Sequence, residues 1–350
     1  MILGQVVFEI KVCEARMRSP LLGFRTDVQH IEFRRDPLTA KWSRINVERT
    51  KRVKQAVKGE EDLSGLISGS RKGCYFCQEN LEEKTPLFPR DLVPEGRLRV
   101  GSSVLFPNLF PFGEYHAVAT FSESHFLGLG EFSPQLVRDC LKNCLEFLRR
   151  VHAKTPEIGY CSINWNHMPP AAASIIHPHL QILADRSPTH YVEELIRKSE
   201  EYFRKNGSNY WSDLIDAERE RKERLIAEID EIVWLTSYAA QGNNEVVGIF
   251  SGISNVGMMR ESHIEALSHG LSRVLRGYND LGVRSFNMSV FSGPLNQDLK
   301  HYSLNLKVMS RPGLRALYTS DCGFMERFHD EPVVETLPED LAGKLRRHFA

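Results

Sequence analysis

The sequence of 350 residues lacks several features that mark specialised classes of protein. It has no excess of either charge, because 45 Lys and Arg residues are balanced by 45 Asp and Glu residues. This balance excludes a protein that acts mainly as a strongly basic nucleic-acid binder, and one that consists mainly of an acidic solvating tail. The seven cysteines are odd in number and widely spread, which is unlike the dense disulfide framework of small secreted proteins. We therefore expect a reducing, cytoplasmic location and no nucleic-acid partner.

Signals for export or membrane insertion are also missing. Residues 1–10 are apolar, but they carry no basic segment and are interrupted by Gln5 and Glu9. No Asp, Glu, Lys or Arg lies between Glu157 and Asp185, yet this stretch holds histidines, asparagines and prolines that a spanning helix would not carry. We expect no membrane partner, and the uncharged His- and Asn-bearing segment indicates a buried polar site.

Hydrophobic patterning predicts an α+β protein with two similarly built halves. In the first half, runs rich in Val, Ile, Tyr and Phe predict strands at 103–107, 116–121, 159–165 and 181–184. Ser133 can cap a helix over 133–153, whose apolar residues form one stripe. The second half repeats this order, with strands at 231–237, 246–250, 285–291 and 302–309, a helix at 261–281 and a C-terminal helix opening at Pro338.

The length fits about two domains. We assign residues 1–190 to an N-terminal half, 191–230 to a helical linker and 231–350 to a C-terminal half. The linker prediction rests on a long, highly charged stretch that Asn206 and Gly207 break into two helices. Residues 1–30 are weakly patterned, and the polar residues 45–72 are expected to form a loop.

The sharpest local signal is the sequence His-Pro-His-Leu-Gln at 177–181. Side chains alternate along a strand, so His177, His179 and Gln181 would share one face. Three polar groups in a row are costly to bury without partners. A hydrogen-bonded ladder without function is the alternative, but the glutamine and the missing charges nearby favour a functional site.

A second signal is the Cys-x-x-Cys spacing of Cys74 and Cys77. Such a pair can give two thiolates to zinc and needs two more ligands. Because the sequence has no second Cys-x-x-Cys, the other ligands would have to be histidines, with His125 and His177 as candidates. A redox pair and two core cysteines are the alternatives. A redox pair should open a helix in a βαβ setting, whereas Gly73 before this pair is more typical of a knuckle.

Together these motifs resemble galactose-1-phosphate uridylyltransferase and its relatives, the branch of the histidine-triad superfamily with His-Pro-His-x-Gln. The resemblance extends from about Ile31 to the C-terminus. No Walker-type phosphate-binding loop is present, so a P-loop mechanism is not supported. The matching stretches occur in the family's order: Arg34-Arg35-Asp36-Pro37-Leu38-Thr39 with Trp42, Cys74 and Cys77, Phe106-Pro107-Asn108-Leu109-Phe110-Pro111, His116 with residues 121–125, Asn166 with Ser174, and His177 with His179.

The resemblance implies two histidine-triad-like half-domains, each a mainly antiparallel sheet with packed helices. It implies a structural Zn²⁺ held by Cys74, Cys77, His125 and His177. It also implies that His179 is the nucleophile and forms a covalent nucleotidyl-histidine, which splits one displacement into two easier ones.

The substrate-binding residues are likewise implied by the resemblance. Gln181 and Ser174 would hydrogen-bond the α-phosphoryl oxygens, Asn108 would lie by the ribose or base, and Asn166 would lie near the phosphates. Relatives are commonly homodimers in which the second subunit helps to close the site. In such a dimer, Arg34 and Arg35 would be the residues that reach across.

The implied activity is ping-pong nucleotidyl transfer, in its most specific form UDP-glucose–hexose-1-phosphate uridylyltransferase of galactose metabolism. Asn305 and Lys307 stand where the sugar transferases carry His-x-His, and Val333 falls where a family Gln touches the hexose. We therefore expect no second metal site, and the acceptor stays open. Lys307 either meets a phosphate or is solvated. The alternatives are a phosphorylase that uses inorganic phosphate on ADP-glucose, a dinucleoside polyphosphate or a sulfonucleotide, and a non-catalytic, zinc-stabilised nucleotide-binding protein.

Overall fold

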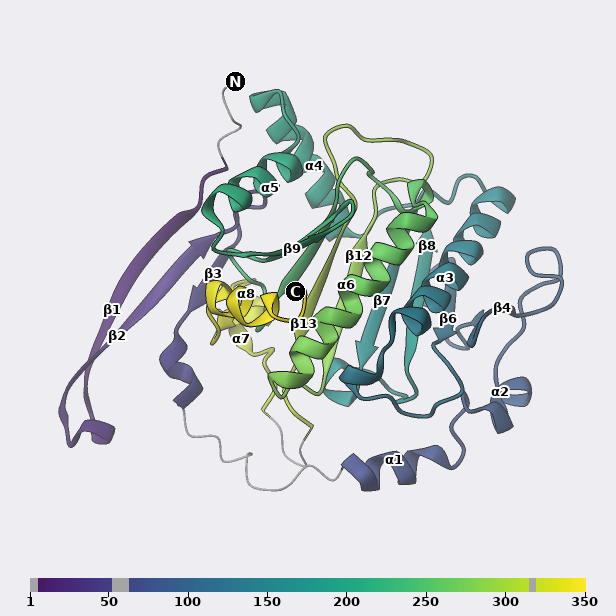
Figure 1. Cartoon of the computed structure of the whole chain (residues 1–350), viewed down its shortest axis with the longest axis horizontal. Coiled ribbons are helices and arrows are strands. Elements are labelled where there is room, and N and C mark those ends of the chain that lie inside the picture. The colour runs from purple at the N-terminus through teal and green to yellow at the C-terminus, as the bar shows by residue number, and fades with distance from the viewer. Residues whose placement is uncertain (1–5, 52–62, 315–318) are drawn as a thin grey trace.

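The computed structural model describes residues 6–51, 63–314 and 319–350 and has an α+β architecture (Figure 1). Its centre is a ten-stranded sheet in the order β4-β5-β6-β8-β7-β12-β13-β11-β10-β9. Every neighbouring pair in this sheet is antiparallel. The predicted fold class is thus confirmed, with the strands of the two halves joined edge to edge in one sheet.

The strands of each half occupy one side of the sheet. The first-half strands are β4 (Leu98–Val100), β5 (Ser103–Pro107), β6 (Tyr115–Thr120), β7 (Tyr160–His167) and β8 (His179–Asp185). The second-half strands are β9 (Leu225–Ile229), β10 (Ile232–Thr236), β11 (Val246–Phe250), β12 (Phe286–Phe291) and β13 (Asn305–Ser310). The seam between the halves is the pairing of β7 with β12, in which Ile163 lies opposite Val290.

Two long helices cover one face of this sheet. They are α3 (Pro134–Lys154) and α6 (Glu261–Asp280), which lie side by side in Figure 1 and contact each other. The predicted cap is confirmed, because the Ser133 hydroxyl accepts a hydrogen bond from the backbone N–H of Leu136 at 3.3 Å. Alternate side chains of the central strands, such as Trp165 and Phe286, pack under these helices in the main core. The remaining alternate side chains therefore point to the opposite face, which we call the outer face.

Three groups of elements lie on or beside the outer face. The helices α4 (His190–Asn206) and α5 (Tyr210–Arg221) cover its second-half strands, where Trp211 packs with Val233 and Val247. The short helices α1 (Leu63–Arg71) and α2 (Gln78–Lys84) flank a knuckle that packs on β5 and β6 at the other end. The polar strip between these two covers is where the candidate site lies.

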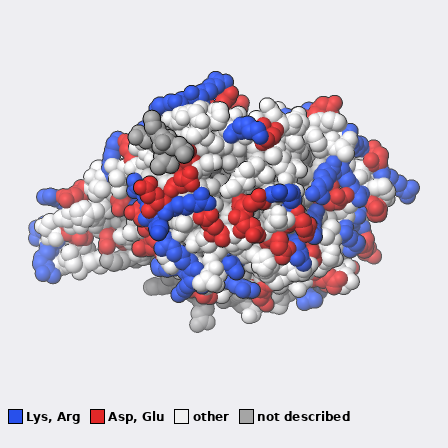
Figure 2. Space-filling model, turned by 45° about the horizontal axis from the view of Figure 1, so that its top comes forward, with Lys and Arg blue, Asp and Glu red and all other residues white. Residues whose placement is uncertain are grey.

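The smaller elements complete the chain. They are η1 (Pro20–Leu22), η2 (Val47–Lys51), η4 (Leu129–Glu131), η5 (Pro169–Ala171), η6 (Val256–Met258), α7 (Phe324–Phe328) and α8 (Pro338–Arg346). Among the described residues, no helix combines the length and apolar character needed to cross a membrane. On the face drawn in Figure 2, positive and negative side chains are interspersed, as the charge balance of the sequence leads one to expect.

A second sheet carries a long arm. Its order is β1 (Glu9–Ser19), β2 (Arg25–Arg35), β3 (Trp42–Ile45) and β14 (Val333–Val334). The strands β1 and β2 pair along their whole length and extend away from the body of the molecule (Figure 1). The weak patterning from residue 9 to residue 30 has a physical reason, because a ribbon largely exposed on both faces needs no apolar side.

Some element predictions are wrong in detail. The helical stretch predicted through Glu228 ends at Arg221, and Leu225–Ile229 form the edge strand β9 instead. Residues 45–72 are not a plain loop, since they include η2 and α1, while 52–62 lie outside the described residues. The strand around the His-Pro-His sequence begins at His179, so His177 lies in the bend before it.

Candidate functional site

Four buried side chains from three separate segments meet beside the first-half end of the outer face. The nearest ligand atoms of Cys74, Cys77, His125 and His177 all lie within 4.8 Å of one another. The Sγ atom of Cys77 is 3.3 Å from Nδ1 of His125 and 3.7 Å from Nδ1 of His177. The Sγ atom of Cys74 is 3.9 Å from the same Nδ1 of His177. The structure thus brings together the four residues that the sequence suggested as metal ligands.

A short knuckle holds the two cysteines. Gly73 has a positive φ of 85°, a conformation that glycine adopts without strain, and it turns the chain into Cys74. The side-chain amide of Asn80 donates to the backbone carbonyl of Cys74 at 3.0 Å and closes the turn. The knuckle is anchored to the sheet because Phe76 packs on Phe106, with ring centroids 5.3 Å apart.

The second ring nitrogen of each histidine fixes the ring. Nε2 of His177 lies 2.9 Å from the backbone carbonyl of Ser122, which can only accept, so Nε2 carries the hydrogen. The hydroxyl of Ser70 donates to the carbonyl of Leu66 at 2.6 Å, so it accepts from Nε2 of His125 at 3.0 Å. Both Nδ1 lone pairs therefore face the thiols, which is the tautomer that a metal-binding histidine requires.

Burial disfavours charge on these side chains unless a cation compensates it. Burial and the neighbouring Cys74 thiol raise the pKa of Cys77 to about 12. Burial lowers the pKa of His177 to about 4 and also lowers that of His125. Two sulfur and two nitrogen ligands suit a tetrahedral ion such as Zn²⁺. The chemistry of the four residues therefore fits a structural metal ion.

His179 is the first residue of β8 and lies beside this cluster. Its Nδ1 is 2.8 Å from the backbone carbonyl of His177, so Nδ1 donates and Nε2 keeps its lone pair. The one hydrogen bond that the ring makes among the described residues is this one through Nδ1. The edge of the ring packs against Phe76, with centroids 5.2 Å apart. Burial lowers the pKa of His179, so the ring is neutral at neutral pH.

Polar side chains continue from His179 across the outer face. Gln181 of β8, Asn164 of β7, Ser289 of β12 and Lys307 of β13 are in register on adjacent strands. The hydroxyl of Ser289 donates to the Asn164 side chain at 2.8 Å. This polar row crosses the seam, so both halves contribute to one surface.

A second pair of amides lies one step along the same strands. The amide of Asn287 donates to Oδ1 of Asn166 at 2.7 Å and to the carbonyl of Ala171 at 2.9 Å. The guanidinium of Arg311 donates to Oδ1 of Asn287 at 3.1 Å. Asn166, a predicted substrate-binding residue, is therefore positioned by a strand of the other half.

The other predicted substrate-binding residues lie in different settings. Asn108 is half-buried, with its side-chain nitrogen 3.2 Å from the ring of His116. Ser174 is exposed in the segment that precedes His177. The predicted arginines lie on the arm sheet and have ionic partners of their own. Arg34 is buried between Glu32 and Glu339, and Arg35 pairs with Glu9.

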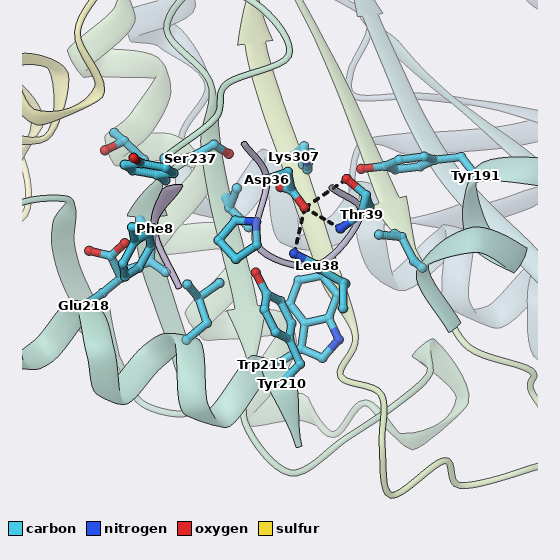
Figure 3. Close-up of a pocket in the computed structure, with 17 residues that line it drawn as sticks. Phe8, Asp36, Leu38, Thr39, Tyr191, Tyr210, Trp211, Glu218, Ser237 and Lys307 are labelled. Atoms are coloured by element: carbon cyan, nitrogen blue, oxygen red, sulfur yellow. Dashed lines mark hydrogen bonds between the residues drawn. The ribbon is translucent and has the colours of Figure 1, made fainter. Parts of the chain in front are cut away.

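Lys307 joins the polar row to a pocket under α4 and α5. The pocket has a volume of about 550 Å³, counting its open mouth, and aromatic side chains such as Tyr191 and Trp211 line it (Figure 3). Asp36 enters it from the N-terminal segment and accepts hydrogen bonds from the backbone of the following residues, drawn as dashed lines. Burial lowers the pKa of Lys307, but the Glu245 carboxylate 3.0 Å away, together with Tyr191 and Asp36, raises it by more, so the lysine stays charged.

Several contributors were not singled out from the sequence. Ser70 lies far from the two motifs in sequence, and no spacing rule connects it to His125. Asn287 and Ser289 carried a signal, because they alternate with apolar residues on a predicted strand. That signal indicates only that one face of the strand is polar. The pairing with β7 that brings Asn287 and Ser289 to the site joins residues far apart in the sequence, so the alternation does not predict it.

Comparisons with known proteins place this geometry in context. No family model matches the chain. An uncharacterised protein of Archaeoglobus fulgidus is 30% identical over 336 residues, which cover 95% of this chain and 97% of that protein.

Solved structures share the fold at low sequence identity. An ADP-glucose phosphorylase of Arabidopsis thaliana with bound ADP-glucose superposes with a TM-score of 0.71, at 20% identity over 90% of this chain and 98% of that one. A GalT-like protein of the same plant gives a TM-score of 0.68 at 19% identity, over 90% and 98%. A uridylyltransferase gives 0.67 at 16% identity, over 90% and 97%.

Proposed function

Since the chain belongs to one family with the Archaeoglobus fulgidus protein and has the fold of the GalT-like proteins, we propose that it is a nucleotidyl-transfer enzyme in which His179 carries the nucleotide. The single observation that carries the proposal is the state of the His179 ring. A carbonyl holds its Nδ1 hydrogen at 2.8 Å, and the lone pair on Nε2 is free.

The chemistry follows from that ring. Nε2 of His179 attacks the α-phosphorus of a nucleotide sugar, and the bond from that phosphorus to the bridging oxygen breaks. The sugar phosphate leaves with the electron pair, and the nucleotide stays on the imidazole as a phosphoramidate. An oxygen of an acceptor phosphate then attacks the same phosphorus and frees the ring. Neutral donors such as Gln181 and the exposed hydroxyl of Ser174 stabilise the charge that develops on the phosphoryl oxygens.

We also propose that Cys74, Cys77, His125 and His177 hold a structural Zn²⁺. When bound, the ion would tie the knuckle to the segment that ends in His179. The carbonyl that orients His179 belongs to His177, one of these four residues. A fixed His177 therefore means a fixed nucleophile two residues on.

The substrates follow from the polar surface and the shared fold. We propose a nucleotide sugar as donor and a sugar phosphate or inorganic phosphate as acceptor. The most specific form is UDP-glucose–hexose-1-phosphate uridylyltransferase, with phosphorolysis of ADP-glucose as the second candidate. The second candidate is supported by Asn305 and Lys307, which stand where the sugar transferases carry His-x-His, while Lys307 pairs with Glu245. A cytoplasmic homodimer, with Arg34 and Arg35 at the partner's site, stays a prediction.

Intact-mass spectrometry tests the nucleotidyl-histidine directly. The protein is mixed with UDP-glucose, ADP-glucose and a dinucleoside tetraphosphate, and a mass increase of one nucleoside monophosphate is expected with at least one donor. The His179→Ala variant should show no increase, whereas His30→Ala, on the exposed arm, should behave as wild type. A wild-type protein that binds nucleotide but never gains this mass would contradict the proposal and favour a non-catalytic nucleotide-binding protein.

The acceptor is identified by a second mixing step. The isolated nucleotidyl protein is exposed either to hexose 1-phosphate or to inorganic phosphate. Loss of the adduct to the hexose phosphate, with formation of a nucleotide sugar, identifies a transferase. Loss to inorganic phosphate, with formation of a nucleoside diphosphate, identifies a phosphorylase.

A further inference from the structure

The ring of His116 contacts the amide of Gln181 and has no role in the steps above. The ring of His116 lies 3.0 Å from Oε1 of Gln181 through its Nε2, and Asn108 and Phe112 contact the same ring. We propose that His116 is a positioning residue that fixes which end of the Gln181 amide faces the substrate. The inference rests on the proposed function and deepens it.

The sheet register brings His116 and Gln181 together. On the neighbouring strands β6 and β8, His116 lies opposite Leu183 and Gln181 lies opposite Val118. His116 and Gln181 are therefore diagonal neighbours on the outer face, within reach of long side chains. His116 is almost fully buried, whereas Gln181 is half-buried, so the ring supports the amide from the protein side.

The hydrogen on the ring decides what the ring can do. The backbone N–H of Phe112 points at Nδ1 at 3.4 Å, so Nδ1 accepts and Nε2 carries the hydrogen. Nε2 then donates to Oε1 of Gln181 at 3.0 Å. In the opposite tautomer, a hydrogen on Nδ1 would face the Phe112 N–H, and the amides of Asn108 and Gln181 would compete for one lone pair. The first arrangement satisfies two hydrogen bonds and leaves the Asn108 NH₂, 3.2 Å from the same Nε2, facing a donor. The second satisfies only one hydrogen bond.

Burial supports the neutral state of this ring. It lowers the pKa of His116, although the Gln181 hydrogen bond and the Asp185 carboxylate act in the other direction. A neutral ring has one donor and one acceptor, which is what directional contact with an amide needs. A charged ring would offer two donors and could not accept from Phe112.

The consequence lies at the other end of the amide. With its carbonyl held by His116, Gln181 presents its NH₂ group away from the ring, and no acceptor for this group is present among the described residues. An NH₂ group stabilises a phosphoryl oxygen, whereas a flipped amide would present a carbonyl oxygen and repel it. His116 thus sets the polarity of the contact that Gln181 makes with the α-phosphoryl group.

The loop before β6 holds the ring of His116 in place. The backbone N–H of Phe110 donates to Oδ1 of Asn108 at 2.9 Å, and the backbone N–H of Asn108 donates to the carbonyl of His116 at 2.8 Å. The ring of Phe112 packs edge-on against His116 with centroids 4.3 Å apart. The loop therefore fixes both the ring and the N–H group that selects its tautomer.

Kinetics of nucleotidyl-histidine formation test the proposal. His116→Phe keeps a flat ring but removes the donor, and His116→Gln can offer an NH₂ group near the place of Nε2. We expect His116→Phe to slow the chemical step by about 10- to 100-fold, the size of one hydrogen bond to a charged group. His116→Gln should recover a large part of this loss, and KM should change little in both variants.

A stereochemical measurement separates positioning from general structural damage. The donor is supplied as its two α-phosphorothioate diastereomers, in which sulfur replaces one or the other non-bridging oxygen. If Gln181 contacts one of these oxygens, Gln181→Leu and His116→Phe should change the ratio of the two rates in the same direction. The double variant should be no slower than Gln181→Leu alone, because both changes remove the same contact to the phosphoryl oxygen. Rate losses that multiply, with an unchanged diastereomer ratio, would overturn the proposal.

The ring tautomer can be read without any turnover. Nitrogen-15 NMR of histidine-labelled protein should show the hydrogen of His116 on Nε2 in the wild type and in Gln181→Leu, because Phe112 selects it. A hydrogen on Nδ1 in the wild type would overturn the inference. A correct tautomer together with no nucleotidyl adduct on wild-type protein would instead mark failure of the proposed function, so the two failures are distinct.

Discussion

Removal of one cysteine of the metal cluster gives the most direct test of the structure. Cys74→Ser replaces a thiol that lies 3.9 Å from Nδ1 of His177 and leaves the remaining three side chains in place. The serine hydroxyl is a poor ligand for zinc, so the variant should lose the metal. Because metal binding to such a site is coupled to folding, the loss should appear as reduced stability.

The magnitude follows from two contributions. Zinc present at 1,000 times its dissociation constant stabilises the folded state by about 4 kcal/mol. If the knuckle also detaches, the buried side chains of Phe76 and Leu81 become exposed, at roughly 1.5–3 kcal/mol each. The unfolding entropy of 350 residues is roughly 0.7 kcal/mol per degree, so the metal contribution alone corresponds to a fall in Tm of about 5 °C.

The assay combines metal content with thermal unfolding. Wild-type protein should carry about one zinc per chain by elemental analysis, and Cys74→Ser should carry none and unfold at lower temperature. Cys13→Ser is the matched control, because Cys13 is an exposed free cysteine on the arm. If Cys74→Ser keeps both its zinc and its Tm, the assignment of the cluster as a structural metal site is refuted.

Three further predictions follow from particular contacts. Ser70→Ala removes the hydroxyl that accepts from a ligand histidine, and zinc affinity measured by chelator competition should fall by about 10-fold or more; unchanged affinity would contradict the orienting role. Gly270→Ala places a Cβ closer to the ring of Trp234 than van der Waals contact allows, so it should lower the free energy of unfolding in urea by about 1–3 kcal/mol. The matched helical change Gly343→Ala meets nothing within 4 Å and should raise it by up to about 1 kcal/mol; equal effects of the two alanines would be incompatible with the packing described. Burial lowers the pKa of His167 to about 3, against about 6.5 in an unfolded chain. The unfolded state therefore binds more protons between those values, and stability should fall as the pH drops through that window. His167→Phe should flatten this pH dependence in urea titrations, and an unchanged slope would show that His167 does not cause it.

The two chemical motifs could be predicted because each is local. A Cys-x-x-Cys knuckle and a His-Pro-His-x-Gln sequence state their ligand types within a few residues. His125 and His177 were candidate partners of the cysteines from the sequence, the resemblance implied the full ligand set, and the structure brings Cys77 to within 3.3 Å of His125. The side of Gln181 that faces His116 was not predictable, since it depends on strand register and on a hydrogen that no sequence displays.

Other features escaped prediction for different physical reasons. The arm formed by β1 and β2 is solvated on both faces, so it lacks the apolar alternation that identifies a strand. The edge strand β9 follows directly on a charged helix, and its residues Leu225–Ile229 include too few positions to set a period. The ion pair of Lys307 and Glu245 joins strand β13 to the turn before β11. These two segments are distant in sequence and only the folded sheet brings them together.

The seam between β7 and β12 has a consequence for how the protein can be assembled. The contact of Asn166 with Asn287 closes a loop of 121 residues, and such distant pairings form late and slowly. A chain interrupted between α4 and α5 would yield two fragments, each with a bare edge strand that invites pairing with another chain. When the two fragments are co-expressed, the edge strand of each can pair with that of the other. Recovery of the proposed nucleotidyl transfer from two separate polypeptides would then report directly on the closing of this seam.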